Sequence, residues 1–409
     1  MINSHMKIGL VSLRWDGHHT PYANLISQSL IELGHEVTLF IPENHKRKKE
    51  FDNHSRLEIV EVQSTVAGNS PGYLKYINQN IAYYNQLKNI SNCIELDIIH
   101  LLTLDILQPP LLLSAIKNGL DTPTVATIHR DHPYRSSNPT NKFSKEKLTS
   151  ELRKGLQIMV DISTYSLVRF GYIDQLLTHS EELRARLMNG IFRIPSENVT
   201  KIPAPTAPLS EDISQEKARK GLDLPLKKPI ILFFGEMREE KGPDILVNAL
   251  EDITQECAIV FAGKEGYVDS STIEELNTDS QIDIITRFEY IPEDQLASYF
   301  ISSDLLVLPY RRTKGISGPL RQAVMANTSI IASHPTDIGS IVKENNLGEV
   351  FSIGSEEKFA SKVNEFLKGN LSHSEKALST YAEKIHYKSV GSDLIDIYNN
   401  QIYSSKIRN

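Results

Sequence analysis

Short apolar segments alternate along the chain with longer segments in which apolar residues recur every three or four positions. The short segments are rich in β-branched residues and predict buried strands, whereas the longer ones predict amphipathic helices. Such an alternation is typical of βαβ units, whose parallel sheets are covered by helices. The predicted strands are residues 7–13, 36–41, 57–62, 97–102, 124–128, 175–178, 199–202, 230–234, 258–262, 283–286, 305–308, 329–332 and 349–351.

The alternation is interrupted once, by a segment with four prolines, many charges and no long apolar run. Because 409 residues exceed what one core usually holds, the interruption predicts a linker between two domains. The fold class expected is α/β, with two Rossmann-like, doubly wound parallel-sheet domains facing a cleft. The predicted parts are an N-terminal acceptor domain (6–205), the linker (206–228), a C-terminal donor domain (229–385) and a last helix (386–409), for which packing back on the first domain is one option.

The composition narrows the function classes. A formal net charge of −7 provides no basic field for nucleic acid. The apolar run 109–116 is too short to span a bilayer, and no signal-peptide pattern opens the chain, whose first five residues resemble a cloning remnant. Cys93 and Cys257 lie in apolar settings that predict buried thiols in a reducing compartment. A cytoplasmic protein is therefore expected, and peripheral contact with a membrane stays open.

The stretch ILFFGEMREEKG, residues 231–242, leaves a predicted strand and presents Arg238 and Lys241 at a predicted helix start. A helix N-terminus carries roughly half a positive charge, so cations there are repelled. Either the three glutamates of the stretch neutralise them in ordinary surface ion pairs, or a bound anion does. If the turn is helical, the two cations share a face and match a diphosphate in charge and spacing.

The stretch LPYRRTKGISGPLRQAVMAN, residues 308–327, also follows a predicted strand. Ser317 is a plausible N-cap, and Pro319 suits the first helical turn. The N–H groups of residues 317–320 at such a helix start attract phosphate, and the glycines permit close approach. Additional positive charge comes from Arg311, Arg312 and Lys314.

Two polar loops follow strands of the first half. In the first loop Gly17 allows a ligand close to the backbone, and His18 and His19 are candidate ligands or donors, with a surface histidine pair as the alternative. In the second loop His129 is a candidate donor to a sugar hydroxyl or carbonyl, with Asp131 nearby and a solvated loop as the alternative. A metal site would need a third ligand at credible spacing, so no metal is expected.

These segments, taken in order, resemble nucleotide-sugar glycosyltransferases of the two-Rossmann (GT-B) architecture, most closely family four, the glycogen-synthase-like group. The resemblance rests on FFGEMREEKGPDILVNAL, RFEYIPEDQLASYFISSDLLVLPY and VLPYRRTKGISGPLRQAVMANTSIIAS in the second half. In the first half it rests on LVSLRWDGHHTPYANLISQSLIELGHEVTLF, TIHRD and THSEELRARL. It covers nearly the whole chain from Met6.

The resemblance implies roles for individual residues. Arg238 and Lys241 would contact the donor diphosphate, and His129 the transferred sugar, which makes these three the expected catalytic groups. The other implied donor-binding residues are Gly17, Gly235, Gly263, Ile291, Ser317, Gly318, Pro319, Leu320 and Gln322, those of 317–320 through backbone N–H groups. Acceptor binding would involve His18, His19 and Asp131.

One departure from the family concerns two glutamates that its members commonly carry on the loop and helix corresponding to residues 308–327. Here Lys314 and Gln322 occupy those positions. Gln322 can still hydrogen-bond a hydroxyl, but Lys314 cannot accept a hydrogen bond. The contacts to the donor sugar therefore differ from those of the family.

The function predicted from these observations is glycosyl transfer from a nucleotide-diphosphate sugar, a UDP-sugar by preference, with retention and without a metal or a separate cofactor. The acceptor is open among a glycan, a lipid, a small metabolite and a peptide. Two alternatives are a nucleotide-sugar epimerase on the same fold and a nucleotide-sugar-binding protein with impaired catalysis. A dinucleotide-dependent dehydrogenase is disfavoured because no G-x-G-x-x-G follows a predicted strand.

Overall fold

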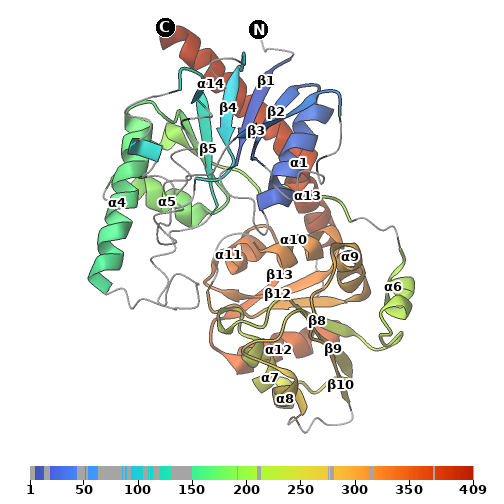
Figure 1. Cartoon of the computed structure of the whole chain (residues 1–409). Helices are drawn as coiled ribbons and strands as arrows, with labels where there is room; N and C mark the ends of the chain where they lie inside the picture. Colours follow the sequence, from blue (N-terminus) through green and yellow to red (C-terminus); the bar gives the residue numbers. More distant parts are fainter. Residues whose placement is uncertain are drawn as a thin grey trace. The chain divides into compact units, whose positions relative to one another are not determined.

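The computed structural model separates the chain into two compact units, one formed by Met1–Pro205 with Tyr387–Asn409 and the other by Thr206–His386 (Figure 1). Within them the structure describes residues 5–12, 19–43, 51, 54–62, 85, 88–89, 94–104, 109, 111–113, 120–129, 150–190, 192–209, 213–274, 276, 281–312, 317–371 and 374–408.

The first unit contains a parallel sheet with the strand order β3-β2-β1-β4-β5-β6-β7. Its strands are β1 (Lys7–Val11), β2 (Glu36–Pro42), β3 (Leu57–Val62), β4 (Ile98–Leu101), β5 (Thr124–Ile128), β6 (Gln175–Thr178) and β7 (Val199–Lys201). Its helices include α1 (His19–Glu32), α4 (Ser150–Arg169), α5 (Glu181–Asn189) and α14 (Tyr387–Arg408).

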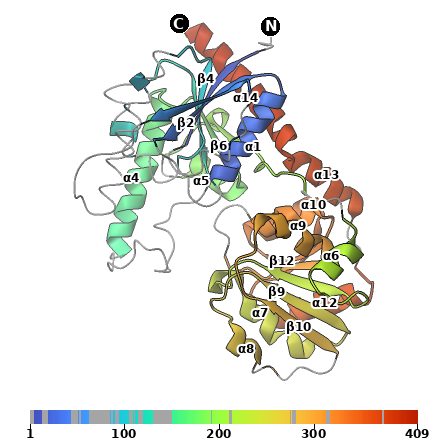
Figure 2. The same ribbon diagram turned by 45° about the vertical axis from the view of Figure 1, so that its right-hand side comes forward.

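Two apolar cores cover the two faces of this sheet. On one face Ile8 and Leu10 of β1 pack with α1 and α14, and on the other Val11 packs with α4 and α5. Figures 1 and 2 show α1 and α14 on one side of the sheet and α4 on the other. Because successive residues of a strand point to opposite faces, strands buried on both sides must be apolar throughout.

The second unit contains a parallel sheet with the order β10-β9-β8-β11-β12-β13. Its strands are β8 (Ile230–Phe234), β9 (Cys257–Ala262), β10 (Ile282–Arg287), β11 (Leu305–Leu308), β12 (Ser329–His334) and β13 (Gly348–Ser352). Its helices include α6 (Gln215–Gly221), α7 (Pro243–Asn248), α8 (Ser270–Glu274), α9 (Glu293–Ser302), α10 (Gly318–Met325), α11 (Asp337–Glu344), α12 (Glu356–Leu367) and α13 (Glu375–Ile385).

The predicted fold class is confirmed, because every predicted strand is present in one of two doubly wound sheets. In each sheet the strand order reverses between two central strands, β1 and β4 in the first and β8 and β11 in the second. The connections from these strands leave in opposite directions, so a crevice opens outside their carboxyl ends, where ligands of such sheets bind.

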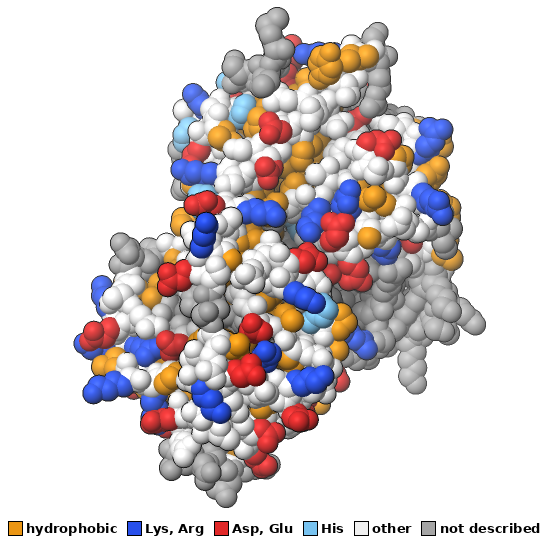
Figure 3. All heavy atoms as spheres, turned by 180° about the vertical axis from the view of Figure 1, so that it is seen from behind, with side chains coloured by type: hydrophobic (Ala, Val, Ile, Leu, Met, Phe, Trp, Pro, Cys, Tyr) orange, Lys and Arg blue, Asp and Glu red, His pale blue; other side chains and the backbone are white. Residues whose placement is uncertain are grey.

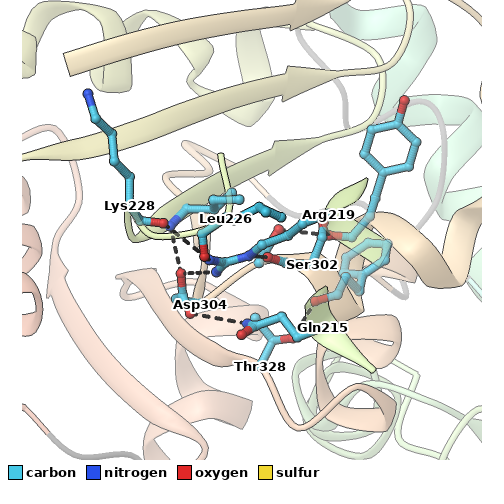
Figure 4. Close-up of polar contacts among 11 residues, drawn as sticks. Gln215, Arg219, Leu226, Lys228, Ser302, Asp304 and Thr328 are labelled. Carbon is cyan, nitrogen blue, oxygen red and sulfur yellow. Dashed lines mark hydrogen bonds and ion pairs between the residues drawn. The ribbon is translucent and has the colours of Figure 1, made fainter. Parts of the chain in front are cut away.

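The predicted linker, residues 206–228, belongs to the second unit. A buried side chain, Arg219 of α6, attaches it there (Figure 4). The guanidinium donates to the carbonyls of Ser302 (2.9 Å), Leu226 (3.1 Å) and Lys228 (3.3 Å), and to the carboxylate of Asp304 (2.6 Å). A guanidinium with acceptors on every side is the arrangement in which a buried charge is tolerated. Helix α6 is therefore fixed on the sheet of the second unit.

Charge is distributed evenly on the face drawn in Figure 3, where acidic and basic side chains are intermingled over the described surface. Cys257 is buried in the second unit, as predicted, whereas Cys93 lies outside the described residues. None of the helices in the described part of the chain is both long and apolar enough to cross a membrane.

We expect Arg219→Met to destabilise the protein by about 3 kcal/mol, because it removes the charged partner of the partly buried Asp304 and the side-chain donor of three carbonyls. Urea unfolding followed by circular dichroism measures this loss. The matched control is Lys220→Met on the same helix, since Lys220 forms only an exposed pair with Glu216 (2.6 Å) and should be dispensable. Equal midpoints for the two variants would contradict the role given to Arg219.

Candidate functional site

The exit of β8 is built around Gly235, whose φ of +114° suits glycine. A Cβ placed on this residue would lie 2.3 Å from Nζ of Lys241. The ammonium of Lys241 therefore occupies the space that any side chain at position 235 would need. The strand-end glycine and Lys241 are thus in direct contact.

The turn that follows is different from the expected helix start. Arg238 has an extended backbone (φ −88°, ψ 146°) and precedes a single 3-10 turn, Glu239–Lys241. Gly242 then adopts the left-handed region (φ +65°), and α7 begins only at Pro243. Arg238 and Lys241 therefore do not share the face of an α-helix, because the 3-10 turn is preceded by an extended residue and followed by a left-handed one.

The ion pairs show which cation the glutamates neutralise. Arg238 lies 3.6 Å from Glu236 and 3.4 Å from Glu240. In the part of the chain that the structure describes, no carboxylate lies within 4.0 Å of the Lys241 ammonium. Burial, followed by the charge of Arg238, lowers the pKa of Lys241 to about 8, against the opposing effect of the two glutamates. Lys241 is thus a half-buried cation at a strand end and is available to an anion.

The exit of β11 lies beside that of β8, because the two strands are neighbours. Tyr310 places its ring under the Lys241 ammonium, with 5.8 Å between Nζ and the ring centroid. Arg311 forms a bidentate ion pair with Asp244 and donates to the Glu239 carbonyl (3.0 Å). The charge of Arg311, expected to favour an anion, is therefore used to join the two loops. Lys314 lies outside the described residues.

Helix α10 begins as predicted, with Ser317 as its N-cap and a proline in its first turn. The Ser317 hydroxyl accepts a hydrogen bond from the Leu320 N–H at 3.2 Å. The prediction that residues 317–320 all offer N–H groups to phosphate was too broad, since Pro319 has no N–H and that of Leu320 is used in capping. The N–H groups of Ser317 and Gly318 are the remaining candidates. Gln322 lies on the same helix, half-buried.

Two further predicted donor-binding residues have packing roles. Gly263, after β9, has a φ of +127°, and a Cβ on it would lie 2.3 Å from the Gly235 carbonyl oxygen. Ile291 is 8 % exposed and belongs to the apolar core of the second unit. Contacts inside the protein thus explain why position 263 carries a glycine and position 291 an apolar side chain.

In the first unit, aromatic side chains gather at the carboxyl ends of the central strands. His129 is buried and its Nε2 donates to the Leu102 carbonyl (2.7 Å), which fixes the orientation of the ring. Its ring centroid lies 5.4 Å from that of His19, 4.6 Å from Tyr22 and 5.1 Å from His179. A histidine from α1 and two from successive strand ends therefore meet although they are distant in sequence.

His19 is 3 % exposed and contacts Thr103 (Nδ1 to Oγ1, 3.2 Å), so the alternative of a surface histidine pair is wrong for this residue. The site residues Gly17, His18 and Asp131, which were also expected here, lie outside the described residues.

A further histidine, His100, lies close to this cluster. His100 of β4 hydrogen-bonds the hydroxyl of Tyr398 on α14 (2.6 Å) and that of Thr127 on β5 (2.8 Å). Burial, together with the nearby His179, lowers the pKa of His100 to about 3, so the ring stays neutral. Helix α14 is thereby joined to the strands that carry His129.

His179 and Tyr310 were not among the predicted site residues. His179 directly follows a predicted strand, as His129 does, and Tyr310 follows one after a single proline; this position is the signal that could have identified them. Among the residues that the structure describes, no group of three or more His, Cys, Asp or Glu side chains is placed to hold a metal ion.

The two halves of the chain match two family models. Residues 21–206 match Glycosyltransferase Family 4, and residues 214–385 match Glycosyl transferases group 1. The D-inositol 3-phosphate glycosyltransferase of Corynebacterium aurimucosum is 22 % identical over 395 residues, which cover 91 % of this chain and 88 % of the relative. The spore coat protein SA of Bacillus subtilis is 24 % identical over 199 residues, 45 % of this chain and 52 % of that protein.

Solved structures share the fold. Sucrose-phosphate synthase from Thermosynechococcus elongatus superposes with a TM-score of 0.72 at 16 % identity, covering 98 % of this chain and 100 % of that one. Anabaena HepE in complex with UDP-glucose gives a TM-score of 0.61 at 13 % identity, covering 99 % and 100 %. The chain therefore belongs to the GT-B glycosyltransferases of the family-four type, and it is a glycosyltransferase by family.

The half-buried, partly desolvated Lys241 ammonium predicts a pH-dependent cost to stability. Below pH 8 the lysine is charged in the folded and unfolded states, so the fold carries the whole cost. Between pH 8 and its ordinary pKa of 10.5 the folded state loses the proton first, and the cost declines. A fall of the pKa from 10.5 to about 8 corresponds to about 3 kcal/mol.

Lys241→Met should therefore stabilise the second unit at pH 7, by up to about 3 kcal/mol, and lose this advantage towards pH 10. Urea unfolding of both proteins at the two pH values measures the difference. A difference that does not change with pH would show that the lysine is not charged and buried as described.

Proposed function

We propose that this glycosyltransferase takes its sugar from a nucleoside-diphosphate sugar, with UDP as the favoured carrier, and binds the diphosphate at the exits of β8 and β11. The observation that carries the proposal is the half-buried ammonium of Lys241, which has no carboxylate within 4.0 Å among the described residues and lies where the strand order reverses. UDP is favoured because Anabaena HepE, which shares the fold, is described in complex with UDP-glucose.

The chemical task of this site is to stabilise the diphosphate as its bond to the sugar breaks. Lys241 supplies a partly desolvated positive charge, which interacts more strongly than a solvated one with the charge that develops on the leaving group. The N–H groups of Ser317 and Gly318, at the start of α10, supply dipoles that require no reorganisation. Arg238 offsets the charges of Glu236 and Glu240, which would otherwise repel a phosphate.

The configuration at the anomeric carbon is retained in this proposal, as the family resemblance implies, and the acceptor attacks the face from which the diphosphate departs. His129 contacts the transferred sugar in this proposal, as the family resemblance implies. Its ring is held in one orientation by the Leu102 carbonyl and by the surrounding aromatic side chains. His18, His19 and Asp131 remain the candidates for acceptor binding. No side chain is assigned as a covalent nucleophile.

The similarity to enzymes that transfer sugars favours this function over the two alternatives. No observation in the two units favours an epimerase or an impaired binding protein. The acceptor class stays open, and its chemistry would follow from residues of the first unit.

Calorimetric titration with UDP, GDP and ADP tests the donor site. We expect UDP to bind the wild type, and Gly235→Ala and Lys241→Met each to weaken it at least tenfold, since the first displaces the ammonium and the second removes it. The control is Lys264→Met, an exposed lysine of the adjacent loop, which should bind like the wild type. If none of the three diphosphates binds, a donor with one of these carriers is refuted. If all three variants bind equally, the diphosphate site is elsewhere.

Turnover provides a separate prediction. With the matching UDP-sugar and acceptor, Lys241→Ala should lower kcat about a hundredfold, as removal of one oxyanion donor commonly does. The wild-type rate should be unaffected by a chelator, because in this proposal Lys241 and backbone N–H groups stabilise the leaving group. A rate that is lost in chelator and restored by manganese or magnesium would contradict the metal-free mechanism.

A further inference from the structure

Tyr310 follows β11 after Pro309, at the exit where the donor site is proposed, and the mechanism above does not use it. Its side chain is 6 % exposed. Burial raises the pKa of its phenol, against the smaller opposing effects of the Ser317 hydroxyl and the Arg238 charge, so the group is neutral. Within the described structure the phenol oxygen makes no hydrogen bond of acceptable geometry. A buried polar side chain without a clear packing reason for its hydroxyl calls for an explanation.

The ring of Tyr310 lies near the side-chain charge that the proposed donor site uses. Nζ of Lys241 lies 5.8 Å from its centroid, within the range of a cation–π interaction. The backbone of Tyr310 is held as well, because the Ser333 hydroxyl donates to its carbonyl oxygen. The ring therefore presents a fixed surface to the ammonium.

Distance alone does not distinguish this pair from others. Lys384 lies 5.9 Å from the Tyr381 ring and Lys388 5.8 Å from the Tyr387 ring. Both of those lysines are exposed, where such an attraction is weak. Lys241 is largely desolvated, and the same attraction is stronger without competing water.

We propose that Tyr310 is a positioning residue, whose ring holds the Lys241 ammonium over Gly235 at the place where the donor diphosphate binds. The inference rests on the proposed function for what the ammonium binds, but the contact itself does not. The ring stabilises the cation without adding negative charge, whereas a carboxylate in its place would cancel the charge and repel a phosphate.

The charged groups around the ammonium are consistent with this role. Arg238, Glu236 and Glu240 of its own loop interact with Lys241 at a distance, and the first is paired with the other two. Arg311, from the loop that carries Tyr310, is committed to Asp244. The ring of Tyr310, within cation–π range, is thus a described group besides the two paired glutamates that favours the charged lysine.

The first test needs no ligand. The pKa of Lys241 is measured by NMR of ¹³C-labelled lysine side chains, assigned with Lys241→Arg, in three proteins with the same ring shape. These are the wild type, Tyr310→Phe, and a protein with pentafluorophenylalanine at position 310, which reverses the ring quadrupole. We expect Tyr310→Phe to titrate like the wild type and the fluorinated ring to lower the midpoint by about half a pH unit or more.

An unchanged or raised midpoint with the fluorinated ring would overturn the proposal, and so would an equal shift in Tyr310→Phe, since the hydroxyl would then be responsible. The matched control places pentafluorophenylalanine at position 299, where a buried tyrosine packs against Phe234. The same shift from this control would also overturn it.

The second test is calorimetric binding of UDP to the same proteins. The fluorinated ring at position 310 should weaken binding about threefold or more and move the high-pH loss of binding to lower pH, while Tyr310→Phe stays within twofold of the wild type. If the wild type does not bind UDP, the proposed function is refuted for this carrier, and the NMR titration still decides the role of Tyr310. If UDP binds all variants equally over the whole pH range, the positioning role is refuted.

Discussion

The ammonium of Lys241 is the charge around which the second unit is arranged. It is kept at a strand end without a carboxylate partner in the described structure, although burial lowers its pKa to about 8. Desolvation of a charge is costly, and proteins usually offset it with an opposite charge. Here the offset is a ring face and a glycine that leaves room, which preserves the charge for a ligand.

The loops around this group are rigid for a reason that the sheet provides. The loops after β8 and β9 are joined by hydrogen bonds from Met237 N–H to the Lys264 carbonyl (2.9 Å) and from Gly235 N–H to the Ala262 carbonyl (2.8 Å). The Arg311 N–H donates to the Glu240 carbonyl (2.9 Å), which joins the β11 loop to the same turn. Side chains on loops fixed by backbone bonds lose little freedom on binding, and such preorganisation favours catalysis.

The first unit gathers histidine rings where the second presents a cation. The ring of His129 packs against those of His19 and His179, and the three rings hydrogen-bond carbonyl or hydroxyl oxygens. Such groups suit the recognition of hydroxyls, which both donate and accept hydrogen bonds.

Local patterns in the sequence determined the strands, the glycine exits and the capped start of α10, because burial on both faces of a parallel strand and the geometry of an N-cap each depend on neighbouring residues. They also indicated Lys241 and His129 as candidates. Only the tertiary structure decided that Arg238 takes the glutamates, that Tyr310 lies under Lys241, and that His179 meets His129. These contacts join segments that are separate in sequence or depend on a turn that ends in left-handed Gly242, so they follow from strand order and backbone conformation, which residue spacing does not encode.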